Sequence, residues 1–279
     1  MENDMDDERR DAEQAGKEQD VWRQLETVLD PELDEPITDL RFVDRVDVVE
    51  NDVKVSFRLP TYWCAPNFAF LMTSDIREHV SRLAWVARVE VALIDHCTSD
   101  QISEGVTHGQ SFEQVFGAEA AGNLDELRST FRRKAFKARQ ERLLRQLKTW
   151  GWSVEAIVRL TVSELSLIVS ADGEYERLRL RYLEIRSDVG LHGAGDSLAF
   201  TTVDGGAISV EVFETYLRGL RTCRLNMEIN THFCRSLLAV RYGVTSNGDD
   251  NSPARESMSS ETPATVGSFS SVPLRWLPR

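Results

Sequence analysis

The chain lacks the features that mark several large classes of protein. It contains no apolar run of the roughly 18 residues that a membrane span requires. Its four cysteines, Cys64, Cys97, Cys223 and Cys234, are too few and too scattered over 279 residues for a disulfide framework. The acidic N-terminus has neither the basic start nor the apolar stretch of a secretory signal. We therefore expect free thiols, a cytoplasmic location and no membrane partner.

Common catalytic and nucleic-acid-binding signatures are also missing. We find no Walker loop, dinucleotide fingerprint, nucleophile elbow or paired cysteine motif. Helix-turn-helix, RNA-recognition and zinc-finger patterns are equally absent. With 33 Lys+Arg against 46 Asp+Glu, the formal net charge is −13, so nucleic acid is an unfavourable partner.

The composition divides the chain into four parts. Residues 1–19 are predicted to be a disordered acidic tail, because residues 1–20 hold nine acids, three bases and almost nothing apolar. Residues 244–279 are predicted to be a second disordered tail, rich in Ser and Thr. Between the tails we expect a small domain over residues 20–107 and a mostly helical domain over residues 108–243.

Residues 20–107 follow the order helix, strand, strand, helix, strand. A helix is predicted to begin after an N-cap at Asp20 and to end before Pro31. Two strands joined by a tight turn at 50–52 come next, then a helix with Pro66 in its first turn, and a third strand over 89–93. The predicted fold class is α+β.

Chemistry-bearing residues gather in the loop before the second helix. Cys64 lies between a strand end and a helix start, where unsatisfied N–H groups favour a thiolate, which is both a nucleophile and a soft-metal ligand. The alternative is a small buried hydrophobic residue, the commonest fate of a free cysteine. Asp30-Pro31-Glu32 after the first helix is either a turn device or a functional pair of carboxylates.

The combined pattern resembles the iron-sulfur cluster assembly family that contains PaaD and SufT. It comprises Leu29-Asp30-Pro31-Glu32-Leu33, the two strands, and Pro60-Thr61-Tyr62 with a nearby cysteine. The resemblance implies a small α/β domain that helps iron-containing proteins to mature, with a reactive cysteine in this loop. It points to Cys64 as the reactive thiol and to Asp30, Glu32 and Thr61 as supporting motif residues.

Two residues depart from the family pattern. Cys64 comes one residue earlier than usual, and Ala65 separates it from Pro66. Arg41 stands where the family usually has glycine, so we expect a less strained or differently turned backbone there. Both changes suggest a subgroup with its own client.

A metal site from Cys64, His96 and Cys97 is a further hypothesis. Asp95-His96-Cys97 follows the third strand, and the three ligands could share iron or a cluster if the strand ends approach each other. The alternative is a solvated loop with an incidental thiol. Cys223 and Cys234 are eleven residues apart on one predicted helix, about 16 Å, too far to hold one ion.

The second half reads as mostly helical, with a short hairpin around Asp204-Gly205 and a long helix ending at Gly243. Residues 128–148 carry nine bases and one acid. This stretch is either a solvated helix face or a surface for an acidic partner or for the chain's own acidic tail. Arg132, Arg133 and Lys137 are its predicted partner-binding residues.

Three functions remain open. The leading one is a cytoplasmic assembly factor, not an enzyme, that handles a transient iron-sulfur cluster or iron on Cys64. Its partners would be other assembly proteins and an iron-containing client enzyme, for which the resemblance suggests a multicomponent di-iron oxygenase. The second is a protein–protein adaptor without metal chemistry, and the third is a thiol enzyme with His96 as the base for Cys64. A homodimer is left open.

Overall fold

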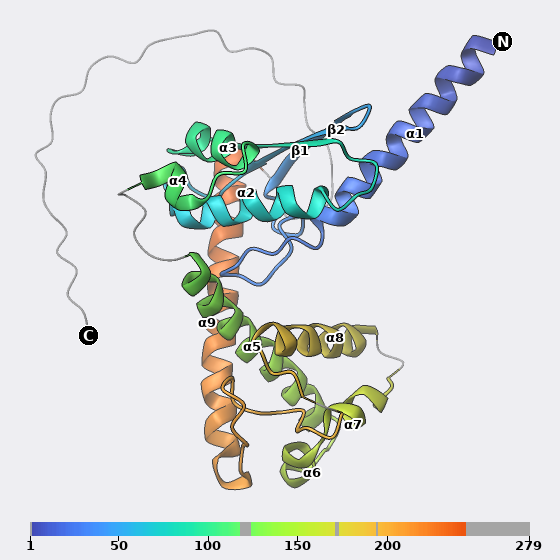
Figure 1. The fold of residues 1–279 in the computed structure, drawn as a ribbon. Helices are drawn as coiled ribbons and strands as arrows, with labels where there is room; N and C mark the ends of the chain where they lie inside the picture. Colours follow the sequence, from blue (N-terminus) through green and yellow to red (C-terminus); the bar gives the residue numbers. More distant parts are fainter. Residues whose placement is uncertain (1, 118–123, 171–172, 194, 244–279) are drawn as a thin grey trace, which may run out of the picture. The chain divides into compact units, whose positions relative to one another are not determined.

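The computed structural model describes residues 2–117, 124–170, 173–193 and 195–243, and it confirms the α+β class (Figure 1). The first half follows the predicted α-β-β-α-β order. Its elements are α1 (Glu2–Leu25), β1 (Val43–Val49), β2 (Asp52–Arg58), α2 (Pro66–Val80) and β3 (Arg88–Ile94). The Ser/Thr-rich segment predicted over 244–279 lies outside the described residues.

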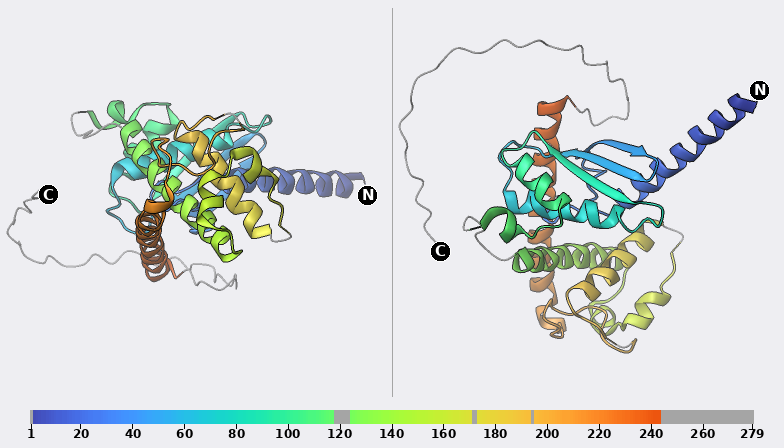
Figure 2. Two further views of the ribbon diagram at one scale, coloured as in Figure 1. Left: turned by 90° about the horizontal axis from the view of Figure 1, so that it is seen from below. Right: turned by 45° about the horizontal axis from the view of Figure 1, so that its top comes forward.

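One three-stranded sheet, in the order β1-β2-β3, organises this half (Figure 2). Strands β1 and β2 are antiparallel and joined by the predicted tight turn, while β2 and β3 are parallel because α2 crosses over between them. Val55 is paired with Val46 on one side and with Val91 on the other. Alternate residues such as Val55 and Phe57 point into the core under α2 and α3 (Ser99–Thr107).

Helix α1 is longer than the sequence predicts. Residues 1–20 are expected to form a solvated tail, whereas in the structure α1 begins at Glu2 and Asp20 lies inside it. Lys17 pairs with Glu13 one turn earlier at 3.2 Å, and its ammonium also donates to the carbonyl oxygen of Glu50 in the β1–β2 turn. These local and tertiary contacts explain why a charged, weakly apolar segment is helical here.

The second half is helical, as predicted. Its elements are α4 (Phe112–Phe116), α5 (Leu124–Thr149), α6 (Val154–Arg159), α7 (Val162–Leu167), α8 (Gly173–Asp188) and α9 (Val210–Tyr242). Helix α9 ends as expected at Gly243, whose φ of +67° suits glycine. The expected hairpin is reduced to a single antiparallel bridge between Thr201 and Ala207. No helix of the described residues has the length and apolar content needed to cross a membrane.

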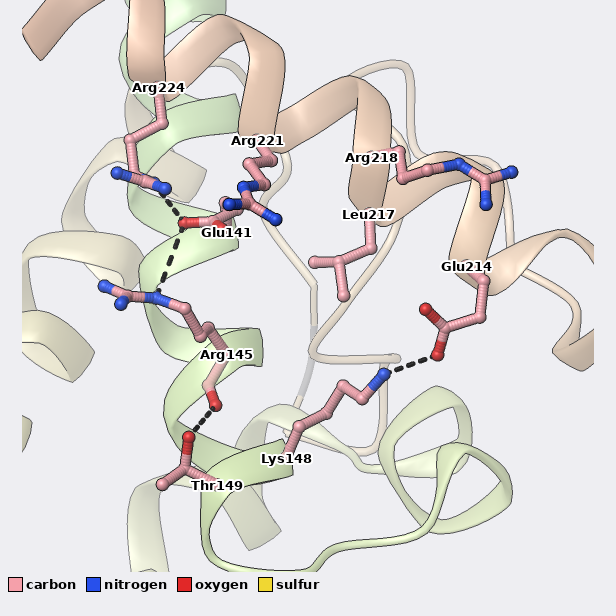
Figure 3. A pocket seen from close by; sticks show the side chains of 9 residues that line it. All are labelled: Glu141, Arg145, Lys148, Thr149, Glu214, Leu217, Arg218, Arg221 and Arg224. Carbon is pink, nitrogen blue, oxygen red and sulfur yellow. Dashed lines mark hydrogen bonds and ion pairs between the residues drawn. The ribbon is translucent and has the colours of Figure 1, made fainter.

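The two longest helices of this half are α5 and α9. They pack against each other, and Phe136 on α5 and Phe213 on α9 are fully buried in a second hydrophobic core. A groove of about 480 Å³ opens between the two helices and is lined mainly by charged side chains (Figure 3).

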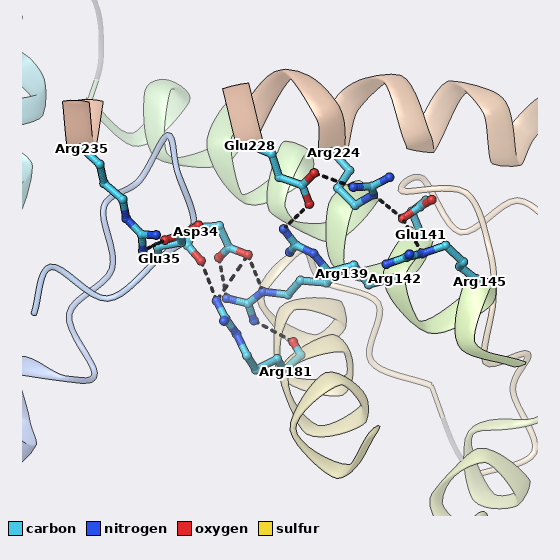
Figure 4. A network of polar contacts seen from close by, with 10 residues as sticks. All are labelled: Asp34, Glu35, Arg139, Glu141, Arg142, Arg145, Arg181, Arg224, Glu228 and Arg235. Atoms are coloured by element: carbon cyan, nitrogen blue, oxygen red, sulfur yellow. Dashed lines mark hydrogen bonds and ion pairs between the residues drawn. The ribbon is translucent and has the colours of Figure 1, made fainter. Parts of the chain in front are cut away.

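A buried ion pair joins the two halves. Arg139 on α5 donates to both carboxylate oxygens of Asp34, at 2.6 and 2.9 Å, and Arg181 on α8 donates to the backbone oxygen of Asp34 at 2.6 Å (Figure 4). Arg235 on α9 pairs with Glu35 at 2.6 Å, and Leu238 of the same helix is buried in the first core. The segment after α1 is therefore held by three helices of the second half.

Candidate functional site

The Cys64 thiol is half-buried in the loop between β2 and α2. The Thr61 hydroxyl lies 3.2 Å from Cys64 Sγ. Ala65 is the N-cap of α2 and makes no side-chain capping bond, Pro66 occupies the first turn, and that turn has no acidic residue. The positive end of the helix dipole is therefore not neutralised by a local carboxylate, which favours an anionic ligand beside Cys64.

His96 supports the backbone of this loop from the end of β3. Its side chain is only 3% exposed, and Nε2 donates to the carbonyl oxygen of Cys64 at 2.7 Å. Nδ1 accepts the backbone N–H of Thr98 at 3.2 Å, and this contact assigns the proton to Nε2. Burial lowers the pKa of His96, which keeps the ring neutral.

The geometry does not bring His96 to the thiol. Both ring nitrogens are used in hydrogen bonds, and Nε2 faces the Cys64 carbonyl oxygen and not Sγ, so the ring is not placed as a base for Cys64. Cys97 approaches the loop through its backbone, whose N–H donates to Tyr62 O at 3.0 Å. Among the described residues, no three His, Cys, Asp or Glu side chains form a metal-binding group. The Cys64–His96–Cys97 site stays a prediction without a supporting contact.

The Asp-Pro-Glu motif is a turn whose centre is the Asp30 carboxylate. Oδ1 of Asp30 accepts the backbone N–H groups of Glu32 and Leu33 at 2.9 and 2.8 Å. Burial raises the pKa of Asp30 to about 6, although these two N–H bonds lower it. The Asp30 carboxylate therefore stabilises the turn that follows α1. This contact fits the first of the two interpretations of the sequence, in which the motif is a turn device.

Helix α9 adds a thiol that the sequence did not connect with this site. Asn230 on α9 lies 3.5 Å from Glu32, and further along the helix Arg241 donates to the carbonyl oxygens of Leu59 and Asp95. Cys234 lies between these two contacts and packs on the same core as Cys64. Burial raises the pKa of Cys234 to about 12, and the charges of Asp30, Cys64 and Glu32 raise it further.

Two aromatic side chains beside Cys64 are exposed to solvent. Trp63 is 76% exposed and Tyr62 is 45% exposed, and their rings contact each other edge to face at 4.9 Å. Large exposed aromatics are typical of the energetically important residues in protein interfaces. The thiol thus lies at the edge of a surface suited to a protein partner.

Arg41 corrects one expectation about the motif. The replacement of the family's glycine suggested a less strained backbone, but Arg41 has a φ of +59°. The chain keeps the left-handed turn that glycine favours, at a cost of about 1 kcal/mol. The turn is retained because Phe42 is buried and its N–H must reach the carbonyl oxygen of Ile37.

The three predicted partner-binding residues on α5 do not share one surface contact. Arg133 pairs with Asp204 at 2.7 Å, while Arg132 lines a cavity of about 220 Å³ next to Asp30. Lys137 lies near Cys223. Burial raises the pKa of the Cys223 thiol, and the positive charge of Lys137 lowers it. Their role in partner binding stays a prediction.

Comparison with known proteins finds a family match for the first part of the chain. No curated protein and no solved structure matches the sequence. Residues 18–91, roughly a quarter of the chain, match the model of the family described as iron-sulfur cluster assembly protein. The match includes Asp30, Glu32, Thr61 and Cys64 and ends before His96. Residues 18–91, called the assembly segment below, are therefore similar to iron-sulfur cluster assembly proteins, in agreement with the resemblance to the family that contains PaaD and SufT.

Proposed function

We propose that this protein is a cytoplasmic assembly factor that handles iron or an iron-sulfur cluster on Cys64 while an iron-containing client matures. The observation that carries the proposal is the position of Cys64 within the assembly segment. Its thiol is half-buried beside Thr61, at a helix start with no acidic residue, and next to exposed aromatics.

The donor set favours transfer over storage. A cluster is usually held by four thiolates, and Cys64 is one thiol. Cys234 is a second sulfur near the site, and burial and the nearby carboxylates raise its pKa, so it is protonated when no metal is bound. The remaining ligands would come from the client or another assembly protein, so the cargo leaves with the partner.

The exposed aromatic pair supports docking at the thiol. Trp63 and Tyr62 offer apolar area that a partner would cover while Cys64 faces it. The helical half would recognise the client, and the resemblance suggests a multicomponent di-iron oxygenase as the client class.

The test is client maturation in cells whose only copy carries Cys64→Ser. Proteins that co-purify with the wild-type chain under anaerobic conditions are identified first, and their iron content and activity are then measured. We expect Cys64→Ser to lower both, whereas Cys223→Ser, a matched thiol change on α9 where the thiol contacts Lys134 on α5, leaves them unchanged. Normal iron content in every candidate client would rule out the thiol mechanism.

An adaptor without metal chemistry is the second candidate, favoured by the exposure of Trp63. It predicts that Trp63→Ala abolishes co-purification of the client, while Cys64→Ser changes neither binding nor client iron content. Loss of iron without loss of binding in Cys64→Ser supports the assembly factor instead.

A further inference from the structure

The groove between α5 and α9 lies apart from the Cys64 loop and has an unusual charge for this protein. Five basic side chains line it in a chain of net charge −13. The lining bases are Arg145, Lys148, Arg218, Arg221 and Arg224, together with the acids Glu141 and Glu214 (Figure 3).

Two of the five bases have close carboxylate partners, within 2.6 Å. Arg224 is nearly buried and donates to Glu141 at 2.5 Å and to Glu228 at 2.6 Å. Lys148 pairs with Glu214 at 2.5 Å. These pairs fix the walls of the groove and leave no free carboxylate near its centre.

The other three bases keep most of their hydrogen-bonding capacity. Arg145 is 4.0 Å from Glu141 with its side chain 63% exposed, and Arg218 donates only to the Thr215 hydroxyl. Within the described residues, the Arg221 side chain has neither a hydrogen bond nor an ion pair. Each guanidinium therefore still offers donors suited to a planar carboxylate.

The size of the groove indicates a peptide. The lining residues of α9 span eleven residues, from Glu214 to Arg224, or about 15 Å of helix. An extended peptide covers this length with about five residues. A single inorganic phosphate would engage one or two of the three arginines. A nucleic acid would bring a continuous row of phosphates past two glutamates on a strongly acidic protein.

An apolar ridge continues the groove along the solvent face of α9. Leu225, Ile229 and Phe233 follow Arg221 at intervals of four residues, which places them on one side of the helix. Ile229 and Phe233 are 64% and 62% exposed. A segment with carboxylates followed by apolar side chains would complement both parts of this face.

We propose that the α5–α9 groove and the adjoining ridge bind an acidic, partly apolar peptide segment of a partner protein. The three under-used arginines provide the charge complementarity, and the ridge provides the apolar contact. This binding does not require Cys64, so it can be tested separately from the proposed function.

The first experiment measures binding of the purified full chain to a fluorescein-labelled peptide in which a run of glutamates is followed by leucines. Fluorescence anisotropy should show binding that weakens as salt is raised. The triple change Arg145→Gln, Arg218→Gln and Arg221→Gln should weaken binding at least about tenfold. Each change removes one ion pair between an arginine and a peptide carboxylate, worth roughly 0.5 kcal/mol. The single change Arg221→Gln, at a residue without a partner in the fold, should weaken it about twofold to threefold.

A matched triple change removes the same number of charges from α5 outside the groove. Arg132→Gln, Arg133→Gln and Lys137→Gln should leave the affinity within about twofold. Equal weakening by both triple variants, or tighter binding of an oligonucleotide or of inorganic phosphate than of the peptide, would overturn the proposal. Cys64→Ser should bind the peptide as the wild type does, and circular dichroism should show that each variant is folded.

Discussion

The guanidinium of Arg139 and the carboxylate of Asp34 form a bidentate ion pair that is about 95% removed from solvent on both sides. The two residues are 105 positions apart, in the assembly segment and in the helical half. Because Asp34 follows the Asp-Pro-Glu turn, this pair fixes the motif relative to α5 (Figure 4). Hydrophobic contacts tolerate small shifts between the two halves. A shift that separated Arg139 from Asp34 would leave a buried charge without its partner, so we infer that the pair favours this one arrangement.

Asp34→Asn should destabilise the protein by about 3 kcal/mol, because it leaves the buried Arg139 guanidinium without a counter-charge. Asparagine also tolerates the φ of +57° at this position, so the backbone strain is unchanged. Urea unfolding measures the free energy of unfolding. Glu90→Gln breaks the exposed pair with Lys54 and should cost less than about 1 kcal/mol. Equal losses of unfolding free energy in the two variants would show that the buried pair stabilises the protein no more than the exposed pair does.

Asp30 should make stability depend on pH. Its pKa rises from 3.8 to about 6 on folding because of burial, so the folded state binds the proton more tightly. The stabilisation linked to this proton is present below pH 4 and is lost as the pH rises through 6, for a total of about 3 kcal/mol. Asp30→Asn keeps an acceptor for the turn and removes the titration. The difference in unfolding free energy between wild type and variant should therefore change between pH 4 and 7, and a constant difference would contradict the raised pKa.

Arg41→Gly should stabilise the protein by about 0.5 to 1 kcal/mol, since glycine adopts a φ of +59° without strain. Thermal unfolding gives the measurement. Arg41→Ala is the control, because it removes the same side-chain contacts but keeps a Cβ atom. An increase in both variants would trace the effect to the side chain and not to the backbone.

His96→Ala should loosen the Cys64 loop. It removes the buried hydrogen bond to the Cys64 carbonyl oxygen, for a loss of about 1 to 3 kcal/mol. Hydrogen exchange of the amides in residues 61–67 should accelerate about tenfold or more. His79→Ala removes a ring that contacts Thr27, away from this loop, and should leave that exchange unchanged. Identical exchange rates in His96→Ala and wild type would show that the ring does not support the loop.

Local patterns predicted the secondary structure well. The alternation of Val53, Val55 and Phe57 identified β2, and Gly243 marked the end of α9. The start of α1 was missed because pairs such as Lys17 with Glu13, and the contact with the β1–β2 turn, outweigh a composition typical of tails.

The environment of the site depends on contacts between distant residues, which periodicity does not report. Cys64 and its loop were predicted from a strand end followed by a helix start. The placement of Cys234 near that loop arises from the packing of α9, 170 residues later in the chain. Likewise, the basic stretch of α5 looked like one surface, but six of its nine bases pair with acids on α2, α5, α9 and two loops.

The most direct test of the central claim is anaerobic loading of the purified full chain with ferrous iron and sulfide. Iron and sulfide bound per chain are measured by equilibrium dialysis, which keeps weakly held cargo in equilibrium with the free ions, for the wild type, Cys64→Ser and Cys223→Ser. We predict that Cys64→Ser loses most of the bound iron and that Cys223→Ser, a change on α9 at a thiol that donates to the carbonyl oxygen of Lys134 on α5, keeps it. Equal iron and sulfide in Cys64→Ser and wild type would contradict the assignment of Cys64 as the residue that handles the cargo.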